Sequence, residues 1–543
     1  MGRLLGGLVG AAFFVWIAGL RALDPGEIGW LMRYDWPVHF FGWHFFRSEP
    51  WHWPPGLITS YYAPAGTAIG FTDSIPIVAL LLKPFSGWLP ATFQYIGPWL
   101  LLCFALQGVF GAWLAGRWTS RLSLQVTVAA LFVLVPTLLV RIGHPSLCAH
   151  WLLLWTLVIA TRDGDGPRYR WVEWGGIGLL AGGLHPYLAL MALAVLAAIA
   201  VSPATVPARR RIATLGVAVV AMLGAWWASG LFGVSGAEAM ATEGLGHYSM
   251  NLLAPISPTG WSVFLPDIPR ATAGQDFEGF QYLGLGTLLL LAMAVVVTRL
   301  APHRTSWTGY APALWIIALA LAAFALSPRV TAGSQVVFDW SGPWTSRLAV
   351  FRATGRFFWP LGYLLLAWAA GVVITRLPPR LALTVLLGVL VTQAVDVHGA
   401  HEERRRAARD PGFYAWTHPM ASPVWHEALP GYRHLVLYPP PQCGGTHVPW
   451  EPAAWLAGLH GLSINTGGVA RPDPALLARY CHDLGDAVKA GRLDDDTVYV
   501  VPESEVAAIR AAQPRARCGA VATIWVCVTE ATADRWPGGA EWR

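Results

Sequence analysis

Charged residues are scarce in this chain of 543 residues. They make up 13% of it, whereas a typical soluble domain has about 25%, and 55% of the chain is hydrophobic. This excludes an ordinary soluble protein, and no nucleic-acid partner is expected. Lysine is nearly absent, with only Lys83 and Lys489. The net charge of +6 is modest, and the positions of the arginines along the chain say more about the protein than the size of this charge.

Cysteine is also rare, and no CxxC pair or zinc-ligand spacing occurs among the six. Four of them fall near the C-terminus, where an even number in an external domain indicates disulfides. Cys518 and Cys527 are close enough for a local hairpin, which leaves Cys443 with Cys481, one of three possible connectivities. The glycines at 283–286 do not form a phosphate-binding loop, because no strand precedes them and no Lys follows.

Long apolar runs recur up to about residue 397, and runs of roughly 20 apolar residues are typical of transmembrane helices. The first run ends in Leu20, Arg21 and Leu23 without a small-residue cleavage site, so we expect an uncleaved span. Eleven spans are predicted, at 4–22, 93–116, 124–141, 147–161, 172–185, 187–201, 211–230, 284–300, 309–327, 357–376 and 381–397.

Arginine placement predicts the topology, because cytoplasmic loops are enriched in basic residues. The short connections carry Arg117 and Arg121, then Arg162, Arg168 and Arg170, then Arg209 to Arg211, Arg299 and Arg304, and Arg376 and Arg380. The opposite connections, 23–92, 231–283 and 328–356, are long and rich in aromatic residues and Pro. We therefore expect a cytoplasmic N-terminus and a periplasmic C-terminus in a bacterial inner membrane. Three prolines break residues 73–90, which predicts a re-entrant or interfacial hairpin.

The composition changes after residue 398. The charged segment HEERRRAARD is followed by alternating strand-like runs (HLVLY, TVYVV, TIWVCV) and helix-like runs. This alternation is typical of a small α/β domain. The expected fold is a polytopic α-helical membrane domain, residues 1–398, followed by a periplasmic α/β domain, residues 399–543.

The stretch RYDWPVHFFGWHFFRSEPWHWPPG, residues 33–56, combines many aromatic rings with titratable groups. Trp and Tyr favour the membrane interface. Asp35 has two interpretations. A carboxylate at membrane depth usually marks a functional site and can act as a general base. Alternatively, Asp35 before Trp36 and Pro37 matches a helix N-cap.

The order of these features resembles the GT-C superfamily of membrane glycosyltransferases, which take sugars from polyprenyl-phosphate carriers. The shared features are an inside N-terminus, one span, and a long external loop with an acidic residue in YDWPVHF, followed by many spans and an external α/β domain. The segments HFFGWHFFRSEPW, TDSIPIVALLLKPFS, HPSLCAHW and GRFFWPLGY are similar to a family of bacterial inner-membrane proteins of unassigned function. The superfamily resemblance implies that Asp35 deprotonates or orients the acceptor.

A lipid-phosphate leaving group needs cations, and the planar guanidinium suits it. The candidates are Arg352 and Arg356, which share a face if FRATGRFFWP is helical, together with His144. Membrane snorkelling is the alternative for the two arginines. Arg47, Arg141 and Arg347 are secondary candidates.

Polar groups among aromatic rings suit sugars, which offer hydroxyls and CH faces. Such groups also suit any interfacial loop, so both interpretations stay open. The expected sugar- or acceptor-binding residues are Asp73, His150, His185, Tyr248, Gln275 and Glu278. A metal site would need His with a carboxylate such as Asp73. No cofactor is expected to be required.

These features predict a cell-envelope transferase that acts with inversion. Its donor would be a polyprenyl-phosphate-linked sugar and its acceptor a glycan or a lipid-linked glycan. A transporter or lipid flippase is one alternative, but broken helices and paired repeats at mid-membrane are typical of that class, and no repeat is found. A non-catalytic scaffold for envelope assembly is the other.

Overall fold

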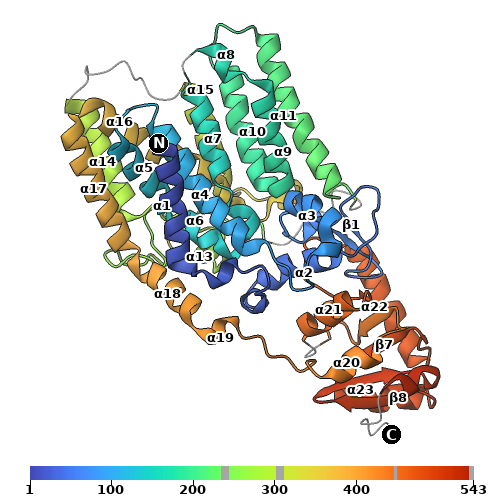
Figure 1. The fold of residues 1–543 in the computed structure, drawn as a ribbon. Helices are drawn as coiled ribbons and strands as arrows, with labels where there is room; N and C mark the ends of the chain where they lie inside the picture. The colour runs from blue at the N-terminus through green and yellow to red at the C-terminus, as the bar shows by residue number, and fades with distance from the viewer. Residues whose placement is uncertain (163, 234–243, 301–310, 446–448, 537–543) are drawn as a thin grey trace. The chain divides into compact units, whose positions relative to one another are not determined.

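The computed structural model describes the chain except residues 163, 234–243, 301–310, 446–448 and 537–543 (Figure 1). The predicted external loop 231–283 thus lies partly outside the described residues. The chain divides into two compact units. The bundle unit comprises Met1–Glu27, Gln94–Ala225 and Met240–Phe413, and the sheet unit comprises Ile28–Phe93, Trp226–Ala239 and Tyr414–Arg543.

Each apolar stretch predicted to span the membrane contains a helix within the described residues. In the bundle unit α1 lies alongside α4 and α5, and α9 lies beside α10 (Figure 1). The helices are α1 (Gly2–Ala18), α4 (Ile96–Ala115), α5 (Leu122–Val133) with α6 (Pro136–Val140), α7 (Trp151–Ala160), α9 (Trp171–Leu184), α10 (Pro186–Val201), α11 (Ala208–Ala228), α14 (Leu285–Leu300), α15 (Pro312–Ala325), α16 (Trp359–Arg376) and α17 (Pro379–Asp396).

Among the described residues, four helices are long and apolar enough to cross a membrane, not eleven. They are Ile96–Ala115, Ala208–Ala228, Thr354–Arg376 and Pro379–Asp396, and Leu122–Val133 with Pro136–Gly143 adds a fifth if this pair, bent by 46°, counts as one span. Five further apolar helices have 10–17 residues, which at about 1.5 Å per residue is shorter than a bilayer core of about 30 Å. Proline explains several of the short lengths, because α6, α10 and α15 each begin at a proline.

Small residues let the first helices of the bundle approach closely. A Cβ added to Gly6 of α1 would lie 2.4 Å from the carbonyl oxygen of Gly108 on α4, and one at Gly10 would lie 1.9 Å from that of Phe104. Glycines four residues apart are typical of helix pairs in membranes, where backbones pack without intervening side chains. The sequence therefore fixes a tight α1–α4 contact.

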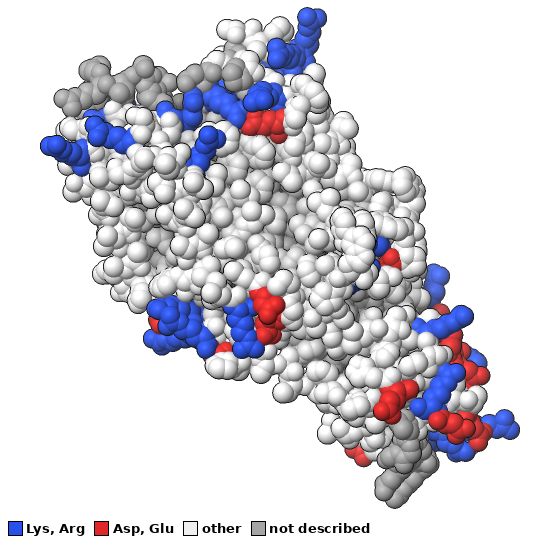
Figure 2. Space-filling view, viewed as in Figure 1, with Lys and Arg blue, Asp and Glu red and all other residues white. Residues whose placement is uncertain are grey.

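Charge is unevenly distributed on the bundle unit (Figure 2). In this view Lys and Arg gather around α8 (Asp165–Arg168) and the neighbouring helix ends, and again over α18 (His398–Arg409). A broad band of uncharged surface separates the two levels. Such a band flanked by charge is typical of a surface that faces lipid.

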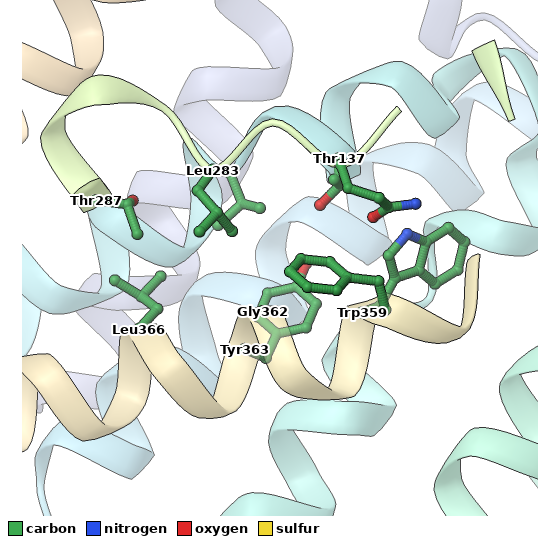
Figure 3. Close-up of a pocket in the computed structure, with 10 residues that line it drawn as sticks. Thr137, Leu283, Thr287, Trp359, Gly362, Tyr363 and Leu366 are labelled. Atoms are coloured by element: carbon green, nitrogen blue, oxygen red, sulfur yellow. The ribbon is translucent and has the colours of Figure 1, made fainter. Parts of the chain in front are cut away.

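A narrow and mostly apolar pocket lies inside the bundle unit beside α16 (Figure 3). Trp359, Gly362, Tyr363 and Leu366 of α16 form one wall, and their spacing places them on one face of the helix. The other lining residues are Val135, Thr137, Gln281, Leu283, Thr287 and Phe358.

The sheet unit contains the predicted α/β domain. The sheet of this domain has five strands in the order β6-β5-β7-β9-β8. Strand β5 pairs in parallel with β6 and β7, whereas β9 runs antiparallel to β7 and β8. The elements are α20 (Pro423–Ala428), β5 (His434–Leu437), α21 (Trp450–Leu459), β6 (Ser463–Ile464), α22 (Pro474–Lys489), β7 (Thr497–Val501), α23 (Glu503–Ala512), β8 (Arg517–Val521) and β9 (Ile524–Val528).

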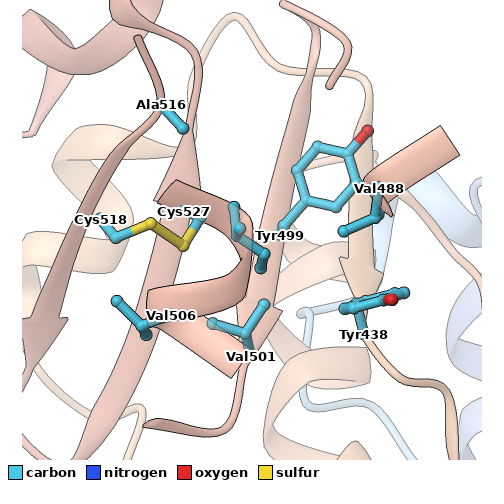
Figure 4. Close-up of a cluster of buried hydrophobic side chains, with 9 residues drawn as sticks. Tyr438, Val488, Tyr499, Val501, Val506, Ala516, Cys518 and Cys527 are labelled. Atoms are coloured by element: carbon cyan, nitrogen blue, oxygen red, sulfur yellow. A yellow bond between two sulfur atoms is a disulfide. The ribbon is translucent and has the colours of Figure 1, made fainter. Parts of the chain in front are cut away.

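Both disulfides predicted for this domain are present. Cys518 and Cys527 join the paired strands β8 and β9, and Cys443 joins Cys481 on α22. The first bridge lies in the apolar core, close to Val506 of α23 (Figure 4). The remaining two cysteines are free and buried in the bundle unit.

The segment after the first helix folds with the C-terminal domain instead of forming a free loop. It contains α2 (Trp36–Phe46), β1 (Leu57–Ile58), β2 (Thr67–Ala68), α3 (Pro76–Leu82) and the 3-10 helix η4 (Lys83–Trp88). The His44 ring of α2 stacks on Trp455 of α21 at 4.8 Å between centroids. The Ile464 N–H of β6 donates to the Ser60 carbonyl at 2.8 Å. The sheet unit is thus built from distant parts of the chain. Toward the C-terminus the bundle unit ends at Phe413, not at residue 398.

Candidate anion-binding site

Among the described residues, two arginines and a glutamate are buried together in the bundle unit. Three short segments supply them: the 3-10 turn η5 (Arg141–Gly143) after α6, the residue after helix α13 (Gly274–Phe277), and the 3-10 helix η8 (Thr354–Phe358) that leads into α16. They contribute Arg141, Glu278 and Arg356, which are 2%, 7% and 7% exposed. We call these three residues the Arg–Glu–Arg cluster.

Both guanidinium groups of the cluster contact the same carboxylate. Arg356 donates from Nε to Glu278 Oε2 at 2.7 Å and from Nη2 to Oε1 at 2.5 Å. Arg141 donates from Nη1 to Oε2 at 2.7 Å and from Nη2 to the Phe277 carbonyl at 2.6 Å. The two-point contact with Arg356 has the fork geometry of the strongest Arg–carboxylate pairs.

Close backbone contact holds the two chain segments in this arrangement. A Cβ on Gly279 would lie 2.1 Å from the Ser249 carbonyl oxygen, and one on Gly355 would lie 2.8 Å from the Cα of Gly279. Gln281 Nε2 also donates to the Gly355 carbonyl at 2.7 Å. The residues beside Glu278 and Arg356 are therefore glycines because the two backbones touch there.

The cluster carries an excess of positive charge, since two guanidiniums share one carboxylate. Burial by itself raises the pKa of Glu278, but the ion pairs with Arg356 and Arg141 outweigh it and hold this pKa well below its ordinary value. His144 Nε2 lies 3.9 Å from Glu278 Oε1. A buried site that carries one net positive charge on guanidinium groups is suited to an anion such as a phosphate group.

A second buried carboxylate anchors the loop that carries Glu278. Asp396, at the C-terminus of α17, accepts hydrogen bonds from Tyr282 Oη at 2.7 Å and from the Leu285 N–H at 2.9 Å. It also accepts one from Ser262 Oγ. These contacts hold both ends of the segment from Ser262 to Leu285 against one helix, which restricts the position of Glu278.

A second group of polar side chains lies beside the apolar pocket of Figure 3, which Trp359 and Tyr363 line. His150 Nδ1 lies 2.7 Å from Tyr363 Oη, which accepts from Gln107 Nε2 at 3.1 Å. The His150 ring lies 4.1 Å from the Trp359 ring, between centroids. The predicted sugar-binding residue His150 is thus fully buried in a polar network within the bundle.

The structure brings three of the predicted site residues together: Arg356, Glu278 and His144. Arg352 does not share a helical face with Arg356, because Ala353 leaves the helical conformation between them (φ −94°, ψ 62°). The Arg352 side chain is exposed and lies 5.7 Å from the Tyr248 ring centroid. The prediction that Arg352 and Arg356 share a face required a continuous helix, and the structure has none between these two residues.

Several other predicted binding residues have structural partners. His185 Nδ1 accepts from the Tyr187 N–H at 3.2 Å and caps α10. Gln275 is fully buried and donates to Thr331 Oγ1 at 2.8 Å. Of the secondary candidates, Arg47 donates to backbone carbonyls that include those of Leu89 and Pro90, both at 2.6 Å.

Asp35 and Asp73 belong to the sheet unit. Asp35 occupies the N-cap position of α2 with Pro37 in the first turn, as the capping interpretation requires, but its exposed side chain makes no capping hydrogen bond. Asp73 has a positive φ of 52°, and its carbonyl oxygen lies 2.9 Å from His39 Nδ1. Within the described residues, no group of three or more His, Cys, Asp or Glu side chains is arranged to hold a metal.

Sequence reasoning placed Arg141 among the secondary candidates and assigned Glu278 to the sugar. Their ion pair joins residues 137 positions apart, and no local pattern reveals such a contact. The available signal was an Arg at the end of an apolar run, since ionisable residues at membrane depth usually mark functional sites. Asp396, at the end of the last apolar run, carries the same signal and was missed.

Two family models match the chain. Residues 7–398 match the family described as "Domain of unknown function (DUF6311)", and residues 424–529 match "DUF6311 C-terminal domain". No curated protein matches the chain. The first match covers well over half of the chain and contains the whole Arg–Glu–Arg cluster. The chain therefore belongs to the DUF6311 family.

Proposed function

We propose that this protein is a membrane glycosyltransferase that takes a sugar from a polyprenyl-phosphate donor and transfers it with inversion to a glycan or lipid-linked acceptor. The observation that carries the proposal is the Arg–Glu–Arg cluster, in which Arg356 lies three residues before α16, near the start of the candidate span Thr354–Arg376. The phosphate of a lipid-linked donor occupies the same zone, at the end of a membrane helix.

The chemistry supports a phosphate ligand because the leaving group of such a transfer is a lipid phosphate, which gains negative charge as the sugar departs. Pre-positioned guanidiniums in a poorly hydrated site stabilise developing charge without having to reorganise. Glu278 keeps Arg141 and Arg356 oriented while leaving one net positive charge. In this proposal Glu278 is a positioning residue, and the arginines bind the phosphate.

The wider architecture supports a cell-envelope location. Disulfides persist in oxidising compartments, and the C-terminal domain contains two. This supports an extracytoplasmic C-terminal domain, which the proposal places in the periplasm, together with a cytoplasmic N-terminus and a bacterial inner-membrane location. In the proposal all eleven predicted segments lie at membrane depth, and the exposed apolar faces of shorter helices such as α1, α14 and α15 contact lipid. Asp35 is proposed as the base for the acceptor hydroxyl, and no metal is required.

The test uses purified protein in lipid nanodiscs, a panel of polyprenyl-phosphate sugars, and a lipid and glycan extract as the acceptor source. The readout is the release of free polyprenyl phosphate. Arg356→Lys keeps the charge but loses the fork, so we expect release to fall at least 10-fold, whereas the control Arg409→Lys, at an exposed arginine of α18, keeps wild-type release. Asp35→Asn tests the base separately, with a loss of transfer expected and donor binding retained.

Two outcomes would contradict the proposal. Release that Arg356→Lys leaves unchanged would remove the phosphate-binding role of the cluster. If folded wild-type protein released nothing from any donor, the activity would be that of a transporter, a flippase or an assembly scaffold. Movement of a labelled lipid between leaflets then identifies a flippase.

A further inference from the structure

A β-hairpin in the bundle unit presents unusually exposed apolar residues. It consists of β3 (Arg329–Ala332) and β4 (Gln335–Asp339), which pair antiparallel. β3 is anchored: Thr331 is 1% exposed and accepts hydrogen bonds at Oγ1 from Asn251 and Gln275, at 3.1 and 2.8 Å. One strand therefore belongs to the fold of the loop that carries Glu278.

Within the part of the chain that the structure describes, the second strand has no such cover. All five residues of β4 are exposed, including Val337 and Phe338 at 59% each. Trp340 (53%) and Trp344 (41%) follow, with their ring centroids 4.9 Å apart. An exposed apolar edge strand invites aggregation in water, and contiguous apolar patches of this kind mark interaction sites. Something apolar covers this strand in the working protein.

The chain on either side indicates what the cover is. The hairpin lies in the connection between α15 and α16, and the end of α15 contacts the start of the α16 segment. Phe324 lies 5.0 Å from Phe357 between ring centroids, and Thr354 Oγ1 donates to the Ala325 carbonyl at 3.3 Å. Because Thr354–Arg376 is a candidate span, a connection that leaves and returns at this end stays at one face of the membrane.

We infer that β4 and the two tryptophans that follow it insert into the lipid headgroup region of the bilayer. Amphipathic Trp rings are enriched at this depth. The charges of the hairpin support the same placement: Arg329 and Asp339 lie at its open end, 3.8 Å apart as an ion pair, and no charged residue lies between Val330 and Phe338. We call residues 335–344 the interfacial segment.

Insertion would set the depth of the candidate site. The interfacial segment is continuous with β3, and β3 is hydrogen-bonded through Thr331 to Gln275 of α13, three residues before Glu278. A hairpin fixed at headgroup depth therefore holds the Glu278 loop near the level of lipid phosphates. The inference does not depend on glycosyltransferase activity, because any protein with this hairpin at a membrane surface would behave in the same way.

Site-directed fluorescence tests the inference. Phe338→Cys is labelled with a fluorescent maleimide; of the native cysteines, four are in disulfides and two are buried. The labelled protein is placed in phosphatidylcholine nanodiscs at one copy per disc. We expect nitroxide attached high on the lipid acyl chain to quench the label at least twofold, and aqueous iodide to quench it weakly.

Two control labels define the range. Val391→Cys on α17, within a candidate span and 61% exposed, reports full lipid contact. Glu403→Cys, exposed on the charged helix α18, reports water. Strong iodide quenching at Phe338 without nitroxide quenching would overturn the inference, and so would protection from both quenchers, which means cover by protein. If Phe338→Cys does not fold, Val336→Cys, which lies on the same face of β4 and is 42% exposed, gives the same test. One copy per disc excludes cover by a second chain.

Discussion

The substitution Glu278→Gln tests the central contact of the bundle unit. It keeps the shape of the side chain but removes the carboxylate charge that both Arg141 and Arg356 contact, so the two buried guanidiniums lose this shared ion pair. Removing one partner of a buried ion pair costs about 3 to 5 kcal/mol. Because the amide oxygen still accepts one hydrogen bond, we expect the lower end, about 3 kcal/mol, or roughly 150-fold in the unfolding equilibrium.

The measurement is denaturant unfolding in bicelles, followed by tryptophan fluorescence and repeated by circular dichroism. Glu403→Gln is the matched control, because that carboxylate is exposed on α18, and surface substitutions usually stay within about 0.5 kcal/mol. A Glu278→Gln protein as stable as the control would refute the reasoning, since the arginines would then be hydrated or neutralised by another group.

The pH dependence of this difference provides a second check. The folded pKa of Glu278 is depressed below its ordinary value of 4.5. A depressed carboxyl group contributes stability that is fully present above the unfolded pKa and is lost as the pH falls through the folded one. The stability gap between wild type and Glu278→Gln should therefore be constant from pH 5 to 8 and shrink below about pH 4.5. A gap that changes between pH 6 and 8 would point to another titrating group.

Two further predictions concern the sheet unit. Burial lowers the pKa of His44 from 6.5 to about 4. As the pH falls below 6.5 the unfolded chain binds a proton that the folded unit does not, so the free energy of unfolding of this unit should fall by about 2 kcal/mol between pH 7 and pH 5. His44→Phe should remove this pH dependence in denaturant titrations. The Cys443–Cys481 bridge closes a loop of 38 residues and the Cys518–Cys527 bridge closes one of 9. Loop entropy therefore predicts that replacing each pair by Ala lowers the free energy of unfolding by about 4 and about 2.5 kcal/mol, respectively. Equal losses would contradict the loop-length argument.

The sequence predicts the elements of this fold better than their assembly. Apolar runs predicted the positions of the helices, because a helix buried in lipid and a helix buried in protein both require apolar residues. The runs therefore do not distinguish a membrane span from a helix buried in protein. That ambiguity is also why they did not predict the number of full-length spans: Pro186 and Pro312 start helices too short to cross alone. Strand and helix patterns in the C-terminal domain, and its disulfides, were readable because their spacing is local.

The candidate site was only partly predictable, for a similar reason. Arg356 and Glu278 were recognised as chemically suited to phosphate and sugar, but sequence does not show that the two side chains neutralise each other. The spacing of Arg352 and Arg356 suggested a shared face, and the non-helical conformation at Ala353 removes it. The exposed strand β4 has an ordinary β-sheet composition, so its lack of cover becomes visible only in three dimensions.

The hydrogen bonds between Ser60, Ala63 and Ile464 have a consequence for biosynthesis. The ribosome makes the segment up to Phe93 about 370 residues before it makes β6, since 464 − 93 = 371. At roughly 5 to 20 residues per second, the delay is about 20 to 75 s. During that time the apolar residues of α2 are already synthesised, but its partner helix α21, which contains Trp455, is not. A chaperone or the membrane surface must shield it until then, and a chain that ends before residue 464 would leave it exposed to quality-control proteases.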